Sequence, residues 1–217
     1  MRPIRGYVFD AYGTLFDVHS VVEAGRAITS DPVAFSAAWR QKPLEYTWLR
    51  ALMGRHEDFW AVTGAALRQT IRRLRLTASE GQLRQLMDAY LSLACFPEVD
   101  AALARLEGRP RAILSNGSPK MLEAAVRSSG LGRHLQHVIS VDAVRTYKPA
   151  PQVYALGPQV LSIPAGELLF VSSNAWDVAG AKAAGYRAAW CNRVGAPEEE
   201  LGGRADVVVE RLDELPL

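Results

Sequence analysis

The chain has 217 residues, of which 49% are hydrophobic and 22% are charged, and its formal net charge is +2. This length and composition are typical of one globular unit, or of a core with a smaller insertion. A net charge so close to zero gives no sign of a nucleic-acid or membrane-surface partner. We therefore expect neither of these partners.

The N-terminal residues and the cysteines bear on where the protein acts. Residues 1–5 lead directly into an apolar strand, without the apolar region and cleavage site of a signal peptide. No apolar run approaches the roughly 20 residues that a membrane-spanning helix needs. Cys95 and Cys191 lack metal or redox spacing, so we expect two buried thiols in a reducing compartment. These features predict a soluble cytoplasmic protein.

The first predicted element is an apolar strand that ends on a carboxylate, Asp10, and is followed by a glycine turn. Such a turn presents a nucleophile at the carboxyl end of a parallel strand, where open α/β sheets bind ligands. A phosphate-handling enzyme with this loop needs a second aspartate two residues later, to protonate an alkoxide leaving group. Tyr12 holds that position here. Because halide leaves as a stable anion, position 12 favours carbon–halogen bonds over phosphate esters.

Residues 19–92 contain four helical stretches and no good strand. The arginines between Arg68 and Arg75 surround an apolar stripe of Leu67, Ile71 and Leu74, which indicates a solvated helix face. We expect an all-α insertion that covers the site as a cap. Apolar residues recur at helical spacing in three groups: Trp39, Leu44, Trp48, Leu49 and Leu52; Phe59, Val62, Ala66 and Leu67; and Leu83, Leu86, Met87, Tyr90 and Leu91.

Beyond residue 108, apolar runs alternate with helical segments. Ser118 and Pro119 are expected to begin a helix, with Ser118 acting only as its cap, and Gly130 to end it. Continuous apolarity in the other runs is typical of strands that are buried on both faces. Strands are predicted at 111–114, 137–141, 168–171, 187–191 and 206–209, and further helices at 151–161 and 176–184.

This alternation predicts the α/β class. We expect a Rossmann-like parallel sheet core with helices on both faces, plus an all-α cap subdomain inserted after the first strand. The predicted core comprises residues 1–16 and 93–217, and the predicted cap comprises residues 17–92.

Polar motifs follow four of the predicted strands, at the point where each strand ends. They are Asp10, the run 115–118, Lys148 and the run 172–177. Because the carboxyl ends of parallel strands share one edge of a sheet, we expect these side chains to lie close together.

These motifs resemble those of the haloacid dehalogenase superfamily and, more narrowly, of the L-2-haloacid dehalogenases. The resemblance covers nearly the whole chain in order, through segments 9–18, 39–42, 44–50, 115–118, 147–149 and 173–177. It implies hydrolytic dehalogenation of short L-2-haloalkanoic acids to D-2-hydroxy acids and halide. Asp10 displaces the halide and forms an aspartyl ester, which water then hydrolyses.

The resemblance also implies roles for residues around the nucleophile. Lys148 keeps Asp10 ionised and stabilises charge on the ester oxygen. The run 115–117 leads into a helix N-terminus, which suits the substrate carboxylate. The implied catalytic residues are Asp10, Thr14, Arg40, Ser115, Asn116, Lys148, Tyr154, Ser172, Asn174 and Asp177.

A second group of residues is implied to bind the substrate and to activate water. Arg40 and Asn116 hold the departing halide beside Trp176. Asn174 and Asp177 place the hydrolytic water, although Asp177 could equally pair with Lys148. The implied substrate-binding residues are Ala11, Tyr12, Arg40, Gln41, Leu44, Phe59, Ser115, Asn116 and Trp176.

We expect no metal and no cofactor. Metal-dependent relatives carry aspartate where Asn174 stands, and Mg²⁺ prefers several hard oxygen ligands, which positions 12 and 174 do not supply. Relatives form dimers, so a homodimer is expected. The four histidines lie outside the motifs and are assigned no role; they are His19, His56, His134 and His137.

Two other functions stay open. A phosphatase of the same superfamily predicts Mg²⁺ dependence and turnover of an aryl phosphate. A non-catalytic anion-binding relative predicts weak binding and no turnover, although the intact set of Asp10, Lys148 and Asp177 argues against it. Halogen preference and acid chain length depend on the width of the pocket, which the sequence does not set.

Overall fold

The computed structural model describes residues 3–216, without the side chains of His19 and Ser20, so the expectation for His19 lies outside the described part. Within this range six parallel strands form one sheet in the order β3-β2-β1-β4-β5-β6, which confirms the α/β class and the Rossmann-like core. The strands are β1 (Gly6–Phe9), β2 (Arg111–Ser115), β3 (His137–Ser140), β4 (Leu168–Ser172), β5 (Arg187–Cys191) and β6 (Val207–Val209).

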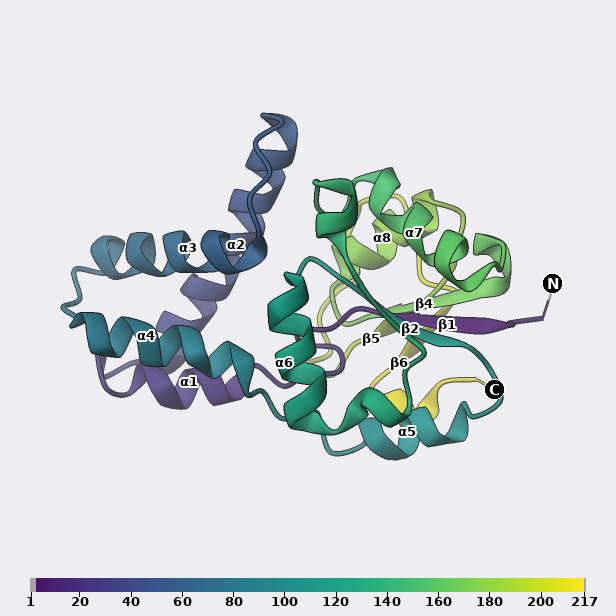
Figure 1. Ribbon diagram of the computed structural model, residues 1–217, viewed down its shortest axis with the longest axis horizontal. Helices are drawn as coiled ribbons and strands as arrows, with labels where there is room; N and C mark the ends of the chain where they lie inside the picture. Colours follow the sequence, from purple (N-terminus) through teal and green to yellow (C-terminus); the bar gives the residue numbers. More distant parts are fainter. Residues whose placement is uncertain (1–2, 217) are drawn as a thin grey trace.

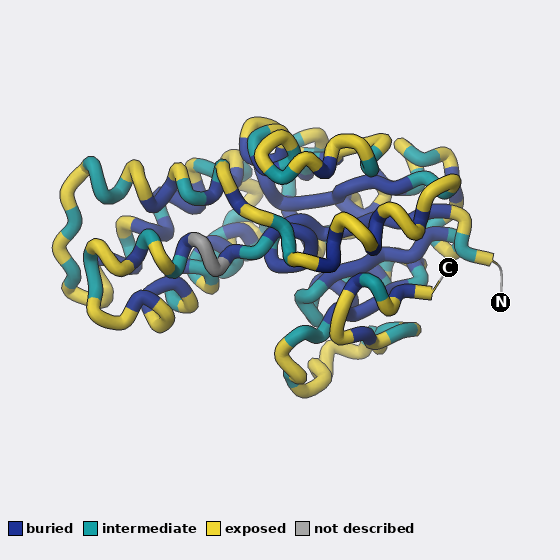
Figure 2. Tube along the Cα trace, turned by 90° about the horizontal axis from the view of Figure 1, so that it is seen from below, coloured by how far each residue is buried: buried dark blue, intermediate teal, exposed yellow. Residues whose placement is uncertain are grey.

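The central strands and the edge strands differ in burial. β1, β2 and β4 are buried along their whole length, as their continuous apolar sequences predict (dark blue in Figure 2). Val138 in β3 and Val208 in β6 are exposed. For these two runs the prediction of burial on both faces is wrong, because they form the two edges of the sheet.

Helices cover both faces of the sheet. Helices α5 (Val99–Arg105) and α6 (Pro119–Ser129) lie on one side, and α7 (Pro151–Leu161) and α8 (Ala175–Ala183) lie on the other (Figure 1). Gly130 ends α6 with a φ of 71°, as predicted.

Ser118 is the N-cap residue of α6, as predicted, but its side chain does not perform the expected capping. Although the backbone of Ser118 is extended, as at an N-cap, its side chain makes no capping hydrogen bond to the described residues. The start of α6 depends instead on Pro119 in the first turn and on the backbone bond from Leu122 N to Ser118 O.

Four helices lie beside the sheet, beyond the carboxyl end of β1 (Figure 1). We call them the helical unit: α1 (His19–Gly25), α2 (Pro32–Leu52), α3 (Phe59–Arg73) and α4 (Glu80–Asp88). Asp31, Asp58 and Ser79 precede α2, α3 and α4, and each side chain accepts a hydrogen bond from a backbone N–H of the first turn. These caps explain where the three helices begin.

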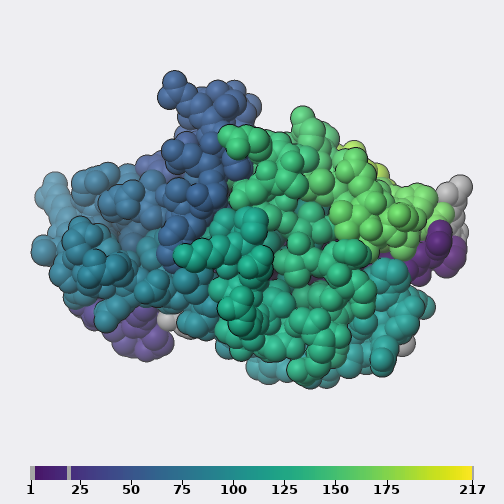
Figure 3. Space-filling model, in the orientation of Figure 1, coloured from purple at the N-terminus to yellow at the C-terminus, as the bar shows by residue number. Residues whose placement is uncertain are grey.

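The apolar stripes of the helical unit are confirmed in part. Trp39, Leu67 and Ile71 are buried and the arginines of α3 are exposed, as predicted. Leu49, Leu52 and Leu74 are exposed, so their expected packing is wrong. The last turns of α2 extend past the rest of the helical unit and form a projection, which is blue in Figure 3.

The loop between α2 and α3 contacts the core next to Lys148. The hydroxyl of Tyr147 accepts a hydrogen bond from Glu57 N at 3.0 Å and donates one to Glu57 O. The ring of His56 stacks on Tyr147 with a centroid distance of 5.0 Å, and its Nε2 lies 3.2 Å from Asp142 Oδ1. His56 therefore has a structural contact that the sequence did not indicate.

Two further expectations concern the cysteines and membrane spans. Cys191 is buried, whereas Cys95 is only partly buried, so the prediction of two buried thiols is wrong for Cys95. In residues 3–216 no helix is long and apolar enough to cross a membrane.

Candidate active site

The predicted polar motifs converge at the carboxyl ends of the central strands. Asp10 follows β1, Ser115 ends β2, and Asn174 and Asp177 lie at the start of α8, after β4. Because β2, β1 and β4 are neighbours in the sheet, these side chains meet, and Lys148 joins them from the segment before α7.

The carboxylate of Asp10 is held by three described side chains. Its Oδ1 accepts a hydrogen bond from Lys148 Nζ at 2.9 Å. Its Oδ2 accepts from Thr14 Oγ1 at 3.2 Å and from Asn174 Nδ2 at 3.1 Å. Asp10 is only 7% exposed, so these donors fix its orientation in a site that bulk water scarcely reaches.

Lys148 is a buried cation between two carboxylates. Its Nζ also lies 2.9 Å from Asp177 Oδ2 and 4.9 Å from the centre of the Phe170 ring. Burial acts to lower the pKa of Lys148, but the attraction of Asp10 and Asp177 outweighs it and raises the pKa. The ammonium therefore carries its charge throughout the physiological range.

Asp177 is fully buried on the far side of Lys148. Burial raises its pKa above the ordinary value, against the opposing effects of Lys148 and of the hydrogen bond from Tyr154 Oη to Asp177 Oδ1 at 2.6 Å. Burial and the charge of Asp177 also raise the pKa of Tyr154, so its phenol stays a donor. Asp177 is thus a stronger base than an exposed aspartate.

The loop that follows Asp10 is fixed through its backbone. Ser173 Oγ donates to Gly13 O at 2.7 Å, and Thr14 Oγ1 accepts from Ser173 N at 2.9 Å. Gly13 has a φ of +85°, and a Cβ atom at this position would overlap Nη2 of Arg40. Glycine is therefore required here both for the turn and for the approach of Arg40. Sequence reasoning gave Ser173 no role of its own.

The predicted residues at the end of β2 contact backbone groups. Ser115 Oγ accepts from Gly117 N at 3.1 Å, and Asn116 Oδ1 accepts from Lys148 N at 2.9 Å. Ser172 Oγ, at the end of β4, accepts from Asn174 N at 3.1 Å. These bonds hold the strand ends together around Lys148 and Asn174.

A small cavity lies between the loop after Asp10 and the helical unit, with a volume of about 50 Å³. We call it the inner cavity. Burial raises the pKa of Tyr12, whose hydroxyl is buried without a partner among the described residues, and raises the pKa of Tyr90 to about 12. Both phenols are therefore neutral. The cavity is lined by Tyr12, Val18, Arg40, Pro43, Leu44, Phe59, Thr63, Tyr90 and Asn174.

The lining of the inner cavity includes predicted and unpredicted residues. Tyr12, Arg40, Leu44, Phe59 and Asn174 were predicted at the site and lie together here. Sequence reasoning missed Val18, Pro43, Thr63 and Tyr90. Of these, Tyr90 belonged to a recognised helical stripe, but the stripe gave no indication that it faced the site.

An open cleft of about 580 Å³ lies between α2 and the start of α8. Lys148 and Trp176 both line it, and Trp176 packs edge-on against Trp48 at a centroid distance of 5.5 Å. Trp176 thus lines a different space from Arg40. Gln41 is exposed and lines neither space, and Ala11 is fully buried under the loop after Asp10.

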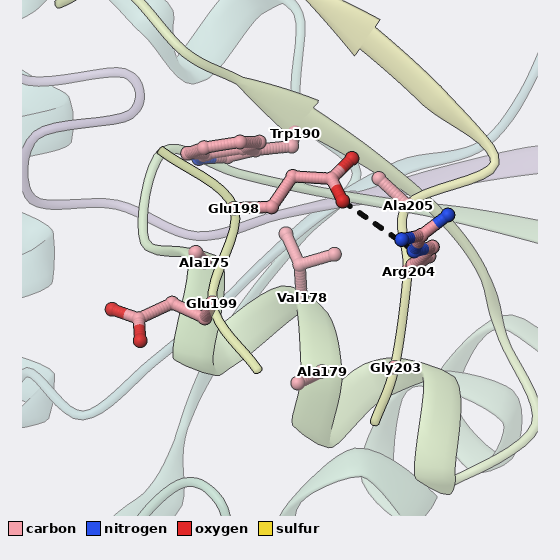
Figure 4. Close-up of a pocket in the computed structure, with 9 residues that line it drawn as sticks. All are labelled: Ala175, Val178, Ala179, Trp190, Glu198, Glu199, Gly203, Arg204 and Ala205. Atoms are coloured by element: carbon pink, nitrogen blue, oxygen red, sulfur yellow. Dashed lines mark ion pairs between the residues drawn. The ribbon is translucent and has the colours of Figure 1, made fainter. Parts of the chain in front are cut away.

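A third space, of about 20 Å³, lies beside the first turns of α8 (Figure 4). Trp190 and Val178 line it, and Glu198 pairs with Arg204 across it at 3.4 Å. Among its described lining residues is none of the predicted site residues. This space is therefore separate from the site around Asp10.

The described residues contain no group of three or more histidine, cysteine, aspartate or glutamate side chains that could hold a metal ion. At the site itself, the Lys148 ammonium stands between the carboxylates of Asp10 and Asp177.

A six-stranded parallel sheet, with Asp10 and Lys148 paired and buried beyond the end of β1, defines an α/β protein with a candidate active site. The chain belongs to the haloacid dehalogenase-like hydrolases, whose family pattern matches residues 4–185. It is therefore a hydrolase of this family.

The chain is similar to enzymes with known substrates. It is 49% identical to (S)-2-haloacid dehalogenase H-109 of Pseudomonas putida, over 99% of this chain and 97% of that protein. It is 45% identical to haloacetate dehalogenase H-2 of Moraxella sp. (strain B), over 98% and 96%. The structure of the L-2-haloacid dehalogenase of Xanthobacter autotrophicus with chloropropionic acid covalently bound is 44% identical, with a TM-score of 0.91 over 97% of this chain and 96% of that chain.

Proposed function

We propose that this protein hydrolyses short L-2-haloalkanoic acids to D-2-hydroxy acids and halide, through an aspartyl ester on Asp10. One observation carries the proposal: Asp10 is buried and held by donors, while Tyr12 stands where an acid for an alkoxide leaving group would be needed. The similar dehalogenases support the same substrate class.

In the first step, a carboxylate oxygen of Asp10 attacks the carbon that carries the halogen. The new carbon–oxygen bond forms as the carbon–halogen bond breaks, and the halide leaves with both electrons of that bond. Attack from the side opposite the halogen inverts the carbon, so an L substrate gives a D product. This step requires no proton, which suits a site with a phenol rather than a carboxyl group at position 12.

The substrate's anionic groups are matched to donors near Asp10. In this proposal Arg40 receives the departing halide, because its guanidinium lines the inner cavity beside Asp10's loop. Asn116 is assigned to the same halide. The expected contact of Trp176 with this halide does not fit, because Trp176 lines the open cleft and not the inner cavity. Ser115, Tyr12 and the start of α6 bind the substrate carboxylate, since the first N–H groups of a helix favour an anion.

In the second step, water attacks the carbonyl carbon of the ester. Asp177 and Asn174 place this water, and the raised pKa of Asp177 makes it a better proton acceptor than an ordinary aspartate. Lys148 stabilises the negative charge that develops on the ester oxygen. The bond between that carbonyl carbon and the substrate oxygen then breaks, the hydroxy acid takes up the proton, and one oxygen of the water remains in Asp10.

The reaction is proposed to need no metal. The Lys148 ammonium supplies the positive charge between two carboxylates that a divalent ion supplies in other active sites. The helical unit acts as the cap (residues 17–92) over the core (residues 1–16 and 93–217), and excludes water from the first step.

Turnover assays separate this function from the alternatives. We expect chloride release from L-2-chloropropionate in the presence of a chelator, with D-lactate as the product and little turnover of the D substrate. Hydrolysis of 4-nitrophenyl phosphate that depends on Mg²⁺ would instead indicate a phosphatase. Binding of small anions without any turnover would indicate a non-catalytic protein.

We also propose that the protein is a homodimer that forms through the projecting end of α2. Leu49, Leu52 and Met53 expose an apolar surface there, and Leu52 is 85% exposed. Isolated molecules rarely leave such a group of apolar side chains in water, and a second copy offers the same surface. Leu52→Glu should give monomers in sedimentation analysis, whereas Val33→Glu, at the other end of α2, should leave the dimer intact. A monomeric wild type would overturn this proposal.

The proposed location is the cytoplasm. Cys95 and Cys191 are both unpaired in the structure, which suits a reducing compartment. Cell fractionation tests this directly, and recovery from a secreted or membrane fraction would contradict it.

A further inference from the structure

Arg193 contacts the loop after Asp10 through the backbone carbonyl groups of that loop. It lies two residues beyond the end of β5. Its Nη1 donates to Gly13 O at 3.2 Å and its Nη2 donates to Thr14 O at 3.0 Å. One planar guanidinium thus holds two successive carbonyl groups of this loop.

The guanidinium of Arg193 is itself held in place. Glu98 Oε1 accepts hydrogen bonds from Nη2 at 2.7 Å and from Nε at 3.2 Å. The Arg193 guanidinium also lies 3.8 Å from the centre of the Phe96 ring. Since the Glu98 side chain is buried, the pair is shielded from solvent and its geometry is well defined.

Gly13 and Thr14 each contact one group of the proposed active site. Thr14 Oγ1 donates to Asp10 Oδ2, and so orients the nucleophile. Gly13 lies against the guanidinium of Arg40, the proposed halide-binding residue. A shift of this loop would therefore move the nucleophile and the halide site relative to each other.

We propose that Arg193 is a positioning residue for the dehalogenation step. It fixes the carbonyls of Gly13 and Thr14, and through them the distance between the Asp10 carboxylate and Arg40. Arg193 touches neither the substrate nor Asp10, so it acts through the loop alone. This inference rests on the proposed function, and it adds to the site a residue that follows β5.

The test compares three variants in single-turnover halide release from L-2-chloropropionate. Arg193→Lys keeps the charge but loses the two-pronged contact, and should slow release by about 10- to 100-fold with a smaller change in KM. Arg193→Ala should be slower still, and added guanidinium ion should restore part of its rate. Glu98→Gln removes the charge that pairs with Arg193, so it should lower thermal stability. It keeps an acceptor for Arg193, so it should retain most of the halide-release rate.

The outcomes separate positioning from simple stabilisation. Folded Arg193→Lys and Arg193→Ala proteins that release halide at the wild-type rate would overturn the inference. So would equal slowing in Glu98→Gln together with no rescue of Arg193→Ala by guanidinium, because that pattern follows from lost stability alone. If the wild type releases no halide, the proposed function is wrong as well. If the wild type is active and the Arg193 variants release halide at the same rate, only this inference is wrong. Arg68→Ala, on the exposed face of α3, is the control. It should release halide at the wild-type rate, with or without added guanidinium.

Discussion

The ammonium of Lys148 lies 2.9 Å from Oδ1 of Asp10, with Lys148 only 1% exposed. The same nitrogen lies 2.9 Å from Asp177. Two buried carboxylates therefore share one cation, and each of them depends on it for charge compensation. The roles proposed for Asp10 and Asp177 both follow from this arrangement.

Replacement of Lys148 with methionine should reduce both activity and stability. Loss of the cation should slow halide release by about 10²- to 10³-fold, because charge in the transition state loses its stabilising group. It should also lower the free energy of unfolding by about 3–5 kcal/mol, since two buried carboxylates remain without a partner. Halide-release kinetics and denaturant titration measure the two effects.

Lys182→Met is the matched control for that variant. Lys182 pairs with Asp206 at 2.8 Å on the surface, where such pairs contribute at most about 1 kcal/mol. Similar losses in the two variants would contradict a special role for Lys148.

Tyr154→Phe should move the acid limb of the pH–rate profile for ester hydrolysis to higher pH. The hydrogen bond from Tyr154 lowers the pKa of Asp177, which burial has already raised. Its removal raises that pKa further, so Asp177 loses its negative charge at a higher pH as the solution is acidified. Single-turnover rates across a pH series measure the shift. Tyr186→Phe, which removes a bond to the Tyr154 backbone instead, should leave the limb in place.

The raised pKa values of Lys148 and Asp177 predict how the free energy of unfolding changes with pH. Lys148 has a raised pKa in the folded state, so its contribution to stability is complete below its ordinary pKa and is lost as pH rises through the folded value. Asp177 also has a raised pKa, so its ionisation opposes folding, and stability falls as pH rises from the ordinary aspartate value through the folded value. Stability that rises with pH across the Asp177 transition in wild type, but not in Asp177→Asn, would contradict this account.

Gly13→Ala should remove activity at a moderate cost in stability. The added methyl group would overlap Arg40 Nη2, and a φ of +85° costs a non-glycine residue about 1–3 kcal/mol. Gly108→Ala is the control, because Gly108 has a φ of +86° with nothing within 4 Å. Both variants should lose similar stability in thermal unfolding, but only Gly13→Ala should lose halide release. Wild-type rates in Gly13→Ala would show that Arg40 need not pack against the loop.

Gly117→Ala should change the preferred chain length of the acid. A Cβ atom at Gly117 would lie 2.8 Å from Cε2 of Tyr12, so the ring must move toward the inner cavity. We expect turnover of 2-chlorobutyrate to fall more than turnover of chloroacetate. Gly132→Ala, whose nearest neighbour is Val126 Cγ1 at 3.6 Å, should alter neither rate. An unchanged ratio of the two rates would mean that Tyr12 does not limit the pocket.

Much of the fold and part of the site follow from local sequence. Asp10, Ser115 and Asn174 were found because a polar residue after a buried strand stands at the edge where parallel strands end. Lys148 was also predicted to stand at the end of a strand, but it lies in the segment before α7 and reaches the site from there. The helix starts at Asp31, Asp58 and Ser79 are equally local, since a capping side chain bonds within its own first turn.

Other features depend on contacts between distant segments, which no local pattern carries. Leu49 and Leu52 fit a helical stripe, but whether a stripe is covered depends on where the neighbouring helix ends. Trp176 and Arg40 match one motif set, yet they line two different spaces. Arg193 also follows a strand, β5, and the rule that located Asp10 would have indicated it too.

The most direct test of the covalent role of Asp10 is a single turnover in ¹⁸O-labelled water, with enzyme in excess over L-2-chloropropionate. The account predicts that the hydroxyl oxygen of the product comes from Asp10 and is unlabelled, while ¹⁸O appears in the peptide that contains Asp10. Label in the hydroxyl group of the first product would show direct attack by water and would contradict the ester intermediate.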